Sequence, residues 1–410
     1  MKATTPRGLR LHIGLFGRRN VGKSSLLNAL TRQAVSIVSD VAGTTTDPVE
    51  KPMELLPIGP VLFIDTAGLD DVGSLGLQRV ERTRQVIDRA DVAFLVVAAG
   101  AWSEFEEQFL TELRRRETPV IVVFNKADLG VAEAALRQRL AEEGVPFVET
   151  IASNERGVAD LRQALIHTVP DEFMNAPAIV GDLVPPGGLA VLVTPIDKEA
   201  PKGRLILPQV QSIRDLLDHD ASVLVVKERE LHHALEQLKH PPNLVVTDSQ
   251  AFLKVDADTP PNVPMTSFSV LFARYKGDLV SFARGALAID TLRPGHRVLI
   301  VEACAHHPIV DDIGRVKIPR WLTQYVGGKL KFTHVQGHDF PAELETYKLV
   351  IHCGACMLNR REVLSRLEQC RQSGVPMTNY GVAIAKCLGI LERALAPFPA
   401  ALATVSKSAM

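Results

Sequence analysis

A glycine-rich loop with a lysine and a serine at fixed spacing stands near the start of the chain. It reads Gly17-Arg-Arg-Asn-Val-Gly22-Lys23-Ser24 and fits the pattern G-x-x-x-x-G-K-[ST], between an apolar stretch and a helical one. Backbone N–H groups of such a loop surround phosphates, and the helix behind it adds the positive end of its dipole. The residues expected to contact a nucleotide here are Gly17, Asn20, Val21, Gly22, Lys23, Ser24 and Ser25.

Two of these side chains and one later segment suit phosphate and Mg²⁺ chemistry. Lys23 would reach the β- and γ-phosphates, and Ser24 would give its hydroxyl to Mg²⁺. The later segment, Asp65-Thr-Ala-Gly68, follows an apolar stretch. There Asp65 would hold Mg²⁺ through water, and the Gly68 N–H would sense the γ-phosphate.

Two further segments complete a nucleotide site in the expected order along the chain. Thr45 lies in a threonine-rich segment where the first switch loop should fall, and it would complete the Mg²⁺ shell. In Asn125-Lys126-Ala127-Asp128, the Asp128 carboxylate can accept both N1–H and the exocyclic amine of guanine, a donor pair that adenine lacks. The sequence therefore predicts Mg²⁺-dependent binding and slow hydrolysis of GTP. The candidate catalytic residues are Lys23, Thr45, Asp65 and Gly68.

Strand-like and helix-like stretches alternate along the whole chain, which predicts an α/β protein with mainly parallel sheets. We expect a Ras-like P-loop GTPase domain at 1–172, followed by two further α/β domains at 173–264 and 265–410, with Pro- and Gly-rich linkers between them. The tail from Pro397 onward is expected to fray. In the first domain we expect strands at 11–16, 61–65, 92–97, 120–125 and 147–150, and helices at 23–31, 78–88, 104–116, 132–143 and 158–169.

Composition limits the classes of partner. The 410 residues carry a net charge of −1, so the chain has no overall electrostatic attraction to nucleic acid or an anionic membrane. Its apolar runs are too short for a transmembrane helix. Five cysteines make a low, odd number that argues against a disulfide framework. We therefore expect a cytoplasmic protein without membrane or nucleic-acid partners.

Three cysteines and two histidines form paired clusters late in the chain. Cys304-Ala-His306 and His352-Cys353-Gly-Ala-Cys356 each follow a short apolar stretch. Because ligands gather outside the carboxyl ends of parallel strands, these clusters should meet. A 4Fe–4S cluster held by the three cysteines, a Cys₃His zinc site, a redox dithiol at Cys353 and Cys356, and unrelated buried thiols are all compatible with the spacing. Cys370 and Cys387 lie in helical patterns and are expected to be packing residues.

The first 170 residues or so resemble the TrmE–Era–Der class of GTPases. Asn20 stands where potassium-activated members of that class carry an asparagine, so the resemblance implies a bound K⁺ and K⁺-stimulated hydrolysis. Leu69 follows Gly68 where Ras-type enzymes have a glutamine. The usual Ser-Ala pair near the base is Ile151-Ala152 here, and the Ala152 N–H is expected to contact the guanine oxygen.

A GTPase of this class joined to C-x-H and H-C-x-x-C resembles the HydF family of FeFe-hydrogenase maturation GTPases. The resemblance extends to the flanking segments 302–308 and 312–321 and so covers nearly the whole chain. It implies that Cys304, Cys353 and Cys356 bind a 4Fe–4S cluster, with His352 or His306 as the candidate fourth ligand. It also implies a homodimer or higher oligomer, and a scaffold or carrier role for a transient 2Fe subcluster precursor. The implied partners are apo FeFe-hydrogenase and two radical-SAM maturases.

Two other functions compete with this interpretation. One is a GTPase for RNA modification or ribosome assembly with a structural zinc site, and the other is a redox-sensing GTPase. The near-neutral charge and an aromatic content of 5% weigh against an RNA-binding surface.

Overall fold

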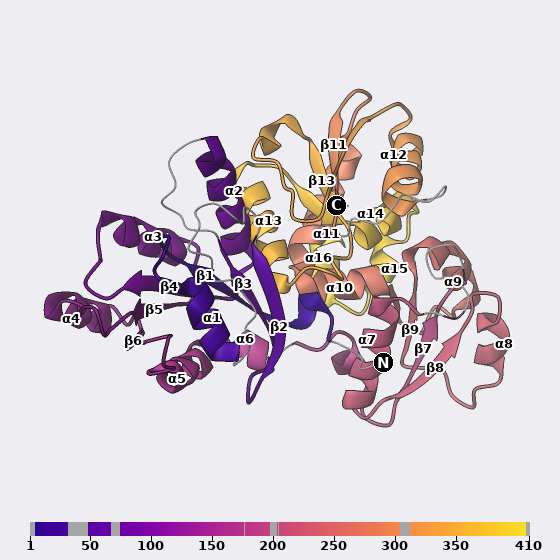
Figure 1. Cartoon of the computed structure of the whole chain (residues 1–410). Helices are drawn as coiled ribbons and strands as arrows, with labels where there is room; N and C mark the ends of the chain where they lie inside the picture. The colour runs from indigo at the N-terminus through magenta and orange to yellow at the C-terminus, as the bar shows by residue number, and fades with distance from the viewer. Residues whose placement is uncertain are drawn as a thin grey trace. The chain divides into compact units, whose positions relative to one another are not determined.

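The structure is a computed structural model that describes all residues except 1–4, 32–47, 67–73, 176, 197–202, 204, 304–311 and 407–410. The chain divides into two compact units, Met1–Ala176 and Pro177–Met410. Figure 1 shows the helices and strands of each unit along the colour ramp. No helix of the described residues is both long and apolar enough to cross a membrane.

The described part of the first unit is built on one sheet with the strand order β2-β3-β1-β4-β5-β6. All neighbouring strands are parallel except β2 and β3, which are antiparallel. The strands are β1 (Leu11–Phe16), β2 (Val49–Leu55), β3 (Gly59–Asp65), β4 (Val92–Ala98), β5 (Val120–Asn125) and β6 (Phe147–Glu149). The helices are α1 (Lys23–Thr31), α2 (Ser74–Arg89), α3 (Glu104–Arg115), α4 (Ala134–Glu142), α5 (Val158–Thr168) and the short α6 (Asp171–Met174).

Apolar side chains on the two faces of this sheet form two separate cores. Leu26 of α1 and Leu161 of α5 pack in one, and Leu110 of α3 and Leu140 of α4 pack in the other. Helices therefore cover both faces, as a buried parallel sheet requires. The Ras-like fold and the five expected strands and helices are confirmed. Strand β2 was not predicted from the sequence, because it is a half-exposed edge strand that contains Pro52.

The described part of the second unit contains two four-stranded parallel sheets that share one continuous core. The first has the order β10-β9-β7-β8, from β7 (Leu189–Val193), β8 (Ser222–Val226), β9 (Leu244–Thr247) and β10 (Met265–Ser267). Helices α7 (Leu207–Asp218), α8 (Leu231–Glu236) and α9 (Phe252–Asp258) lie between these strands along the chain. Strand β10 completes this sheet, although it follows the boundary expected at residue 264.

The second sheet of this unit has the order β12-β11-β13-β14. Its strands are β11 (Arg297–Glu302), β12 (Lys331–Gln336), β13 (Leu349–His352) and β14 (Met377–Asn379). Its helices are α10 (Phe268–Lys276), α11 (Leu279–Leu287), α12 (Ile318–Val326), α13 (Arg360–Gln372), α14 (Tyr380–Cys387), α15 (Leu391–Leu395) and α16 (Pro399–Ser406). The mainly parallel α/β class predicted for this region is confirmed.

Two details at the end of the chain differ from the expectation. The sequence of residues 382–394 has a helical pattern that predicts one helix, but the structure has two, since Gly389 adopts a φ of 74° between α14 and α15. The expectation that the tail frays was wrong for its described part. Helix α16 lies against α11, and it buries Ala401 and Val405, because these small apolar side chains fall on one helix face.

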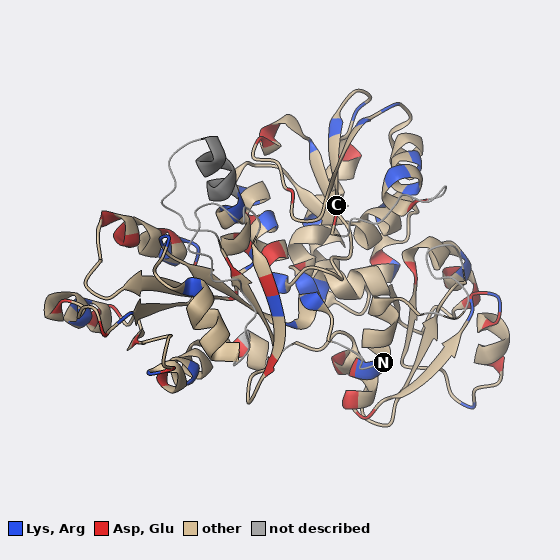
Figure 2. Cartoon of the chain, viewed as in Figure 1, with Lys and Arg blue, Asp and Glu red and all other residues tan. Residues whose placement is uncertain are grey.

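Charged side chains of both signs are interspersed over the described surface. In Figure 2, Lys and Arg alternate with Asp and Glu along the helices and loops, while most of each sheet is uncharged. This mixture agrees with the net charge of −1.

Candidate functional site

The loop between β1 and α1 has the backbone that a phosphate-binding loop needs. Gly17 and Gly22 have φ values of 144° and 95°, and Asn20 has a φ of 60°. A Cβ on Gly17 would lie 2.1 Å from the Val96 carbonyl oxygen, and one on Gly22 would lie 2.2 Å from the Asn125 amide nitrogen. Only glycine fits at both positions, so the spacing of the motif follows from the packing around the loop.

Three polar side chains converge below this loop. Lys23 Nζ donates to the carbonyl oxygens of Gly17 (2.9 Å) and Arg18 (2.8 Å). Ser24 Oγ donates to Asp65 Oδ2 at 2.6 Å. Burial raises the pKa of Asp65, although the Ser24 hydrogen bond and the Lys23 charge act in the opposite direction. Lysine, serine and aspartate thus meet at the carboxyl ends of β1 and β3, as the motifs predict.

The chemistry of this corner fits Mg²⁺. Asp65 Oδ1 is buried and has no hydrogen-bond partner among the described residues. A buried carboxylate oxygen without a partner is costly, and a hydrated Mg²⁺ beside the Ser24 hydroxyl would satisfy it. The expected Mg²⁺ and γ-phosphate contacts of Thr45 and Gly68 lie outside the described residues.

Asn125 ties the phosphate loop to the segment expected to bind the base. Its Nδ2 donates to the Val21 carbonyl at 2.9 Å, and its Oδ1 accepts from Thr150 Oγ1 and the Ala152 N–H, each at 3.1 Å. Asn125 is 2% exposed; its bonds with Val21 and Thr150 are buried, and its bond with Ala152 is partly buried. Since the Ala152 N–H donates to Asn125 here, its contact with guanine stays a prediction.

The remaining residues of the predicted site lie on the loops around it. Asp128 and Asn20 are exposed, so neither carboxylate nor amide is packed into the core. Lys126 and Ser25 are partly buried, and Val21 is 6% exposed. The roles of Asp128 in base selection and of Asn20 in K⁺ binding remain predictions.

The phosphate loop contacts α3 through Arg18, an interaction that no motif predicted. Arg18 Nε lies 2.9 Å from Glu106 Oε1, its guanidinium also donates to Ser103 Oγ, and it stacks 5.1 Å from the Phe105 ring centroid. Ser103 and Glu106 form the capping box of α3. The S-x-x-E spacing of that box was visible in the sequence, but its pairing with Arg18 was not.

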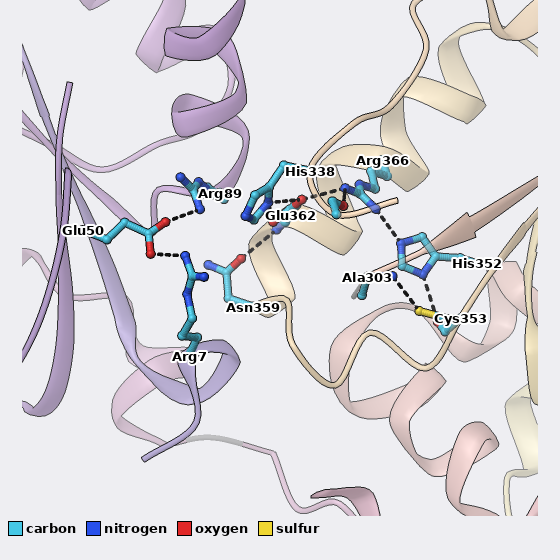
Figure 3. Close-up of polar contacts among 11 residues, drawn as sticks. Arg7, Glu50, Arg89, Ala303, His338, His352, Cys353, Asn359, Glu362 and Arg366 are labelled. Atoms are coloured by element: carbon cyan, nitrogen blue, oxygen red, sulfur yellow. Dashed lines mark hydrogen bonds and ion pairs between the residues drawn. The ribbon is translucent and has the colours of Figure 1, made fainter. Parts of the chain in front are cut away.

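The second site lies where β11 and β13 end side by side. Val301 pairs with His352 across the two strands, and the Cys353 N–H donates to the Val301 carbonyl at 2.9 Å. Cys353 Sγ accepts the N–H of Ala303 at 3.1 Å (Figure 3). It also accepts the N–H of Ala355 at 3.5 Å. Ala303 immediately precedes Cys304 in the sequence, but Cys304 itself lies outside the described residues, so the meeting of the two cysteine clusters stays a prediction.

The N–H groups of Ala303 and Ala355 give Cys353 surroundings that suit a cysteine ligand of an iron–sulfur cluster. Two N–H groups directed at one sulfur stabilise a thiolate, which is the form that binds iron. Cys353 and Cys356 are both partly exposed, and burial raises the pKa of Cys356 while the Lys276 charge opposes that shift. Within the described ranges no group of three His, Cys, Asp or Glu could hold a metal. Cys304 and His306 lie outside those ranges.

His352 is turned into the protein in this structure. It is 1% exposed, its Nε2 lies 2.9 Å from Arg366 Nη1, and its Nδ1 lies 2.9 Å from the Cys353 carbonyl oxygen. Burial and the neighbouring Arg366 charge lower the pKa of His352 to about 3. Both ring nitrogens are therefore already engaged within the described residues.

Comparisons with family models divide the chain into three matched parts. Residues 12–126 match the model described as 50S ribosome-binding GTPase. Residues 179–277 match the Hydrogen maturase F dimerization domain, and residues 280–397 match the Hydrogen maturase F tetramerization domain. The two maturase models together match more than half of the chain.

Curated relatives resemble only part of the chain. The tRNA modification GTPase MnmE of Chromobacterium violaceum is 38% identical over 177 residues, which are 41% of this chain and 38% of that protein. GTPase Der of Wolinella succinogenes is 37% identical over 166 residues, which are 38% of this chain and 35% of that protein. A crystal structure of Era from Aquifex aeolicus is 20% identical, with a TM-score of 0.36 over 53% of this chain and 93% of that one. The chain thus spans less than half the length of these curated relatives.

The phosphate loop, its Mg²⁺ corner and the Ras-like sheet define a P-loop GTPase domain, which is joined here to two further α/β domains. Both of those domains match models of one family. The chain belongs to the HydF family of hydrogen maturases. It therefore carries the oligomerisation domains of that family beside its GTPase domain.

Proposed function

We propose that this protein is a GTP-hydrolysing scaffold or carrier that assembles or delivers the 2Fe subcluster of the H-cluster to apo FeFe-hydrogenase. One observation carries the proposal: Cys353 Sγ accepts the N–H of Ala303, the residue before Cys304, in a chain that also has a GTPase domain. That contact supports the proposal because Ala303, the residue before Cys304 in the sequence, lies against the Cys353 sulfur at the end of β11. The matches of residues 179–277 and 280–397 to Hydrogen maturase F domains favour this proposal over a GTPase for RNA modification with a structural zinc site.

In the proposed GTPase cycle, Lys23 binds the β- and γ-phosphates, and Ser24, Thr45 and Asp65 hold Mg²⁺. Asp128 selects guanine, and Asn20 holds a K⁺ whose positive charge stabilises the charge that develops on the phosphates. Hydrolysis acts as a switch, since GTP orders loops that GDP releases.

We expect K⁺ to raise the rate of GTP hydrolysis by at least about tenfold relative to Na⁺, and an Asn20→Ala variant to lose this stimulation. Phosphate release measured at equal ionic strength checks both.

In the cluster domain, Cys304, Cys353 and Cys356 would hold a 4Fe–4S cluster. A cluster with three protein thiolates supplies one iron that can bind an exogenous group, which suits a protein that must accept and release a cargo. The chain's own contribution is the pair of N–H donors at Cys353 and the turn that follows it. Ala355, with a φ of 53°, shapes that turn.

Dimerisation is proposed to use the exposed edge of the first sheet of the second unit. Strand β8 stands at that edge, and its Val225 is 41% exposed, beside α7 with Leu217 at 57%. An apolar strand edge with unpaired backbone groups is suited to pairing with a second copy. The other proposed partners are the two radical-SAM maturases, which would supply the 2Fe precursor, and the apo-hydrogenase.

Activation of apo-hydrogenase tests the proposed function. The full chain would be purified without oxygen after co-expression with the two maturases and mixed with apo FeFe-hydrogenase. Hydrogen evolution should appear with the wild type and be lost with a Cys304→Ala, Cys353→Ala, Cys356→Ala triple variant that still hydrolyses GTP. Equal activation by both proteins would contradict the proposal.

A further inference from the structure

A buried chain of polar side chains runs from the surface to the cysteine turn. It links the segment after β12, helix α13 and the last residue of β13 (Figure 3). His338 Nδ1 lies 3.0 Å from Glu362 Oε1, and Arg366 Nη2 donates to the same oxygen at 2.7 Å. Arg366 Nη1 lies 2.9 Å from His352 Nε2. The side chains of Glu362 and Arg366 are 6% and 3% exposed, whereas that of His338 is 34% exposed.

The chemistry of these contacts fixes the tautomer of His352. A guanidinium has only donors, so the ring nitrogen that faces Arg366 must accept. The proton of the neutral ring therefore sits on Nδ1, which donates to the Cys353 carbonyl at 2.9 Å. Arg366 thus acts on the backbone of the cysteine turn through one intervening ring.

Arg366 itself is anchored on more than one segment. Its Nη2 also donates to the Gly337 carbonyl at 2.7 Å, and its guanidinium lies 5.4 Å from the Phe340 ring centroid. Residues 337–340 follow β12, whereas His352 ends β13. The planar guanidinium of Arg366 has several N–H donors in fixed directions, so it can bind both segments at once. A lysine would have to bind both through its single ammonium group.

We propose that Arg366 is a positioning residue for the cluster site: it holds His352 as the Nδ1–H tautomer, keeps that ring away from iron, and fixes the Cys353 backbone. The inference rests on the proposed function, because it concerns a cluster bound at Cys353. It assigns His352 to the support of the turn and leaves the fourth iron position to another group. Cys353 can then keep its sulfur beneath the N–H groups of Ala303 and Ala355.

The first test needs no cluster. In the metal-free full chain with ¹⁵N-labelled histidine, long-range ¹H–¹⁵N correlation spectra report the tautomer of each ring, and a His352→Asn variant identifies the signal. The wild type should show only the Nδ1–H form of His352. Arg366→Met should add an Nε2–H population, because only the Cys353 carbonyl then favours the Nδ1 proton, and Arg366→Lys should restore part of the wild-type preference. An Nε2–H signal for His352 in the wild type would overturn the proposal, even if no Arg366 variant folds.

The second test uses the reconstituted, reduced protein. In a His306→Ala background, pulsed EPR should detect no strong histidine nitrogen coupling to the cluster, because His352 is held by Arg366. A strong coupling that disappears on adding His352→Asn would overturn the proposal. If the protein binds no iron and sulfide at all, the proposed function fails, while the tautomer measurement on the metal-free chain still decides the role of Arg366.

Discussion

Replacing Asn125 by alanine should loosen the phosphate loop and lower the stability of the first unit. The substitution removes three hydrogen bonds: those to the Val21 carbonyl and from the Thr150 hydroxyl are buried, and that from the Ala152 N–H is partly buried. Each such bond contributes about 1 kcal/mol. The free energy of unfolding of this unit should therefore fall by about 3 kcal/mol.

The assay is urea unfolding of the full nucleotide-free chain, followed by tryptophan fluorescence. Trp102 lies 6.3 Å from the Phe124 ring, next to Asn125, and reports on this unit. A Trp321→Phe background silences the other tryptophan, which lies in the second unit. At a slope of about 2 kcal/mol per molar urea, a loss of about 3 kcal/mol lowers the midpoint by roughly 1.5 M.

Asn154→Ala is the matched control for this substitution. Its Oδ1 accepts one exposed hydrogen bond, from the Arg156 N–H at 3.1 Å, so the midpoint should hardly move. Thr150→Val should cost about 1 kcal/mol, since it removes one of the three bonds and leaves Asn125 Oδ1 with the Ala152 N–H. A midpoint for Asn125→Ala equal to that of Asn154→Ala would refute the assignment of Asn125 as the tether of the phosphate loop.

Three further predictions concern the base, the dimer and the thiols. Asp128→Asn should weaken GTP binding by about 100-fold and favour xanthosine triphosphate, because the asparagine amide would place an N–H donor against an N–H donor of guanine. Competition between the two nucleotides for the variant checks this. Val225→Lys should raise the dissociation constant of the dimer at least about tenfold, because it places a charge on the edge strand; an unchanged mass in light scattering would contradict the proposed interface. Burial raises the pKa of Cys370 and Cys387 to about 12, so at pH 8 iodoacetamide should label them about a thousandfold more slowly than an exposed thiol, and faster as the pH rises. Equal labelling by mass spectrometry would contradict their buried environment.

Much of the nucleotide site could be predicted from the sequence, because its residues lie close together in short motifs whose spacing fixes their roles. The loop from Gly17 to Ser24 needs its glycines for backbone conformation and clearance, and these requirements appear directly in the motif. Asp65 is the last residue of the buried strand β3, and ligands of a parallel sheet gather at the carboxyl ends of its strands, so its position near Ser24 could be predicted. The strands and helices around these residues were predicted for the same reason: each has a clear apolar period.

Other features depend on contacts between distant residues and could not be predicted in this way. Arg18 pairs with Glu106, and Arg366 spans from Gly337 to His352. No periodicity or motif specifies such partners, because the pairing is set by how helices pack on the sheet. His352 is the sharpest case, since its position beside Cys353 suggests a ligand while its surroundings give both ring nitrogens other partners.

The iron and acid-labile sulfide content of the reconstituted protein shows whether Cys304, Cys353 and Cys356 hold a 4Fe–4S cluster, on which the proposed function depends. The full chain and the Cys304→Ala, Cys353→Ala, Cys356→Ala triple variant would be purified and reconstituted side by side without oxygen. We expect about four irons and four sulfides per chain in the wild type, with a reduced-state EPR signal, and their loss in the variant. One zinc per chain without sulfide, or equal iron in both proteins, would contradict it.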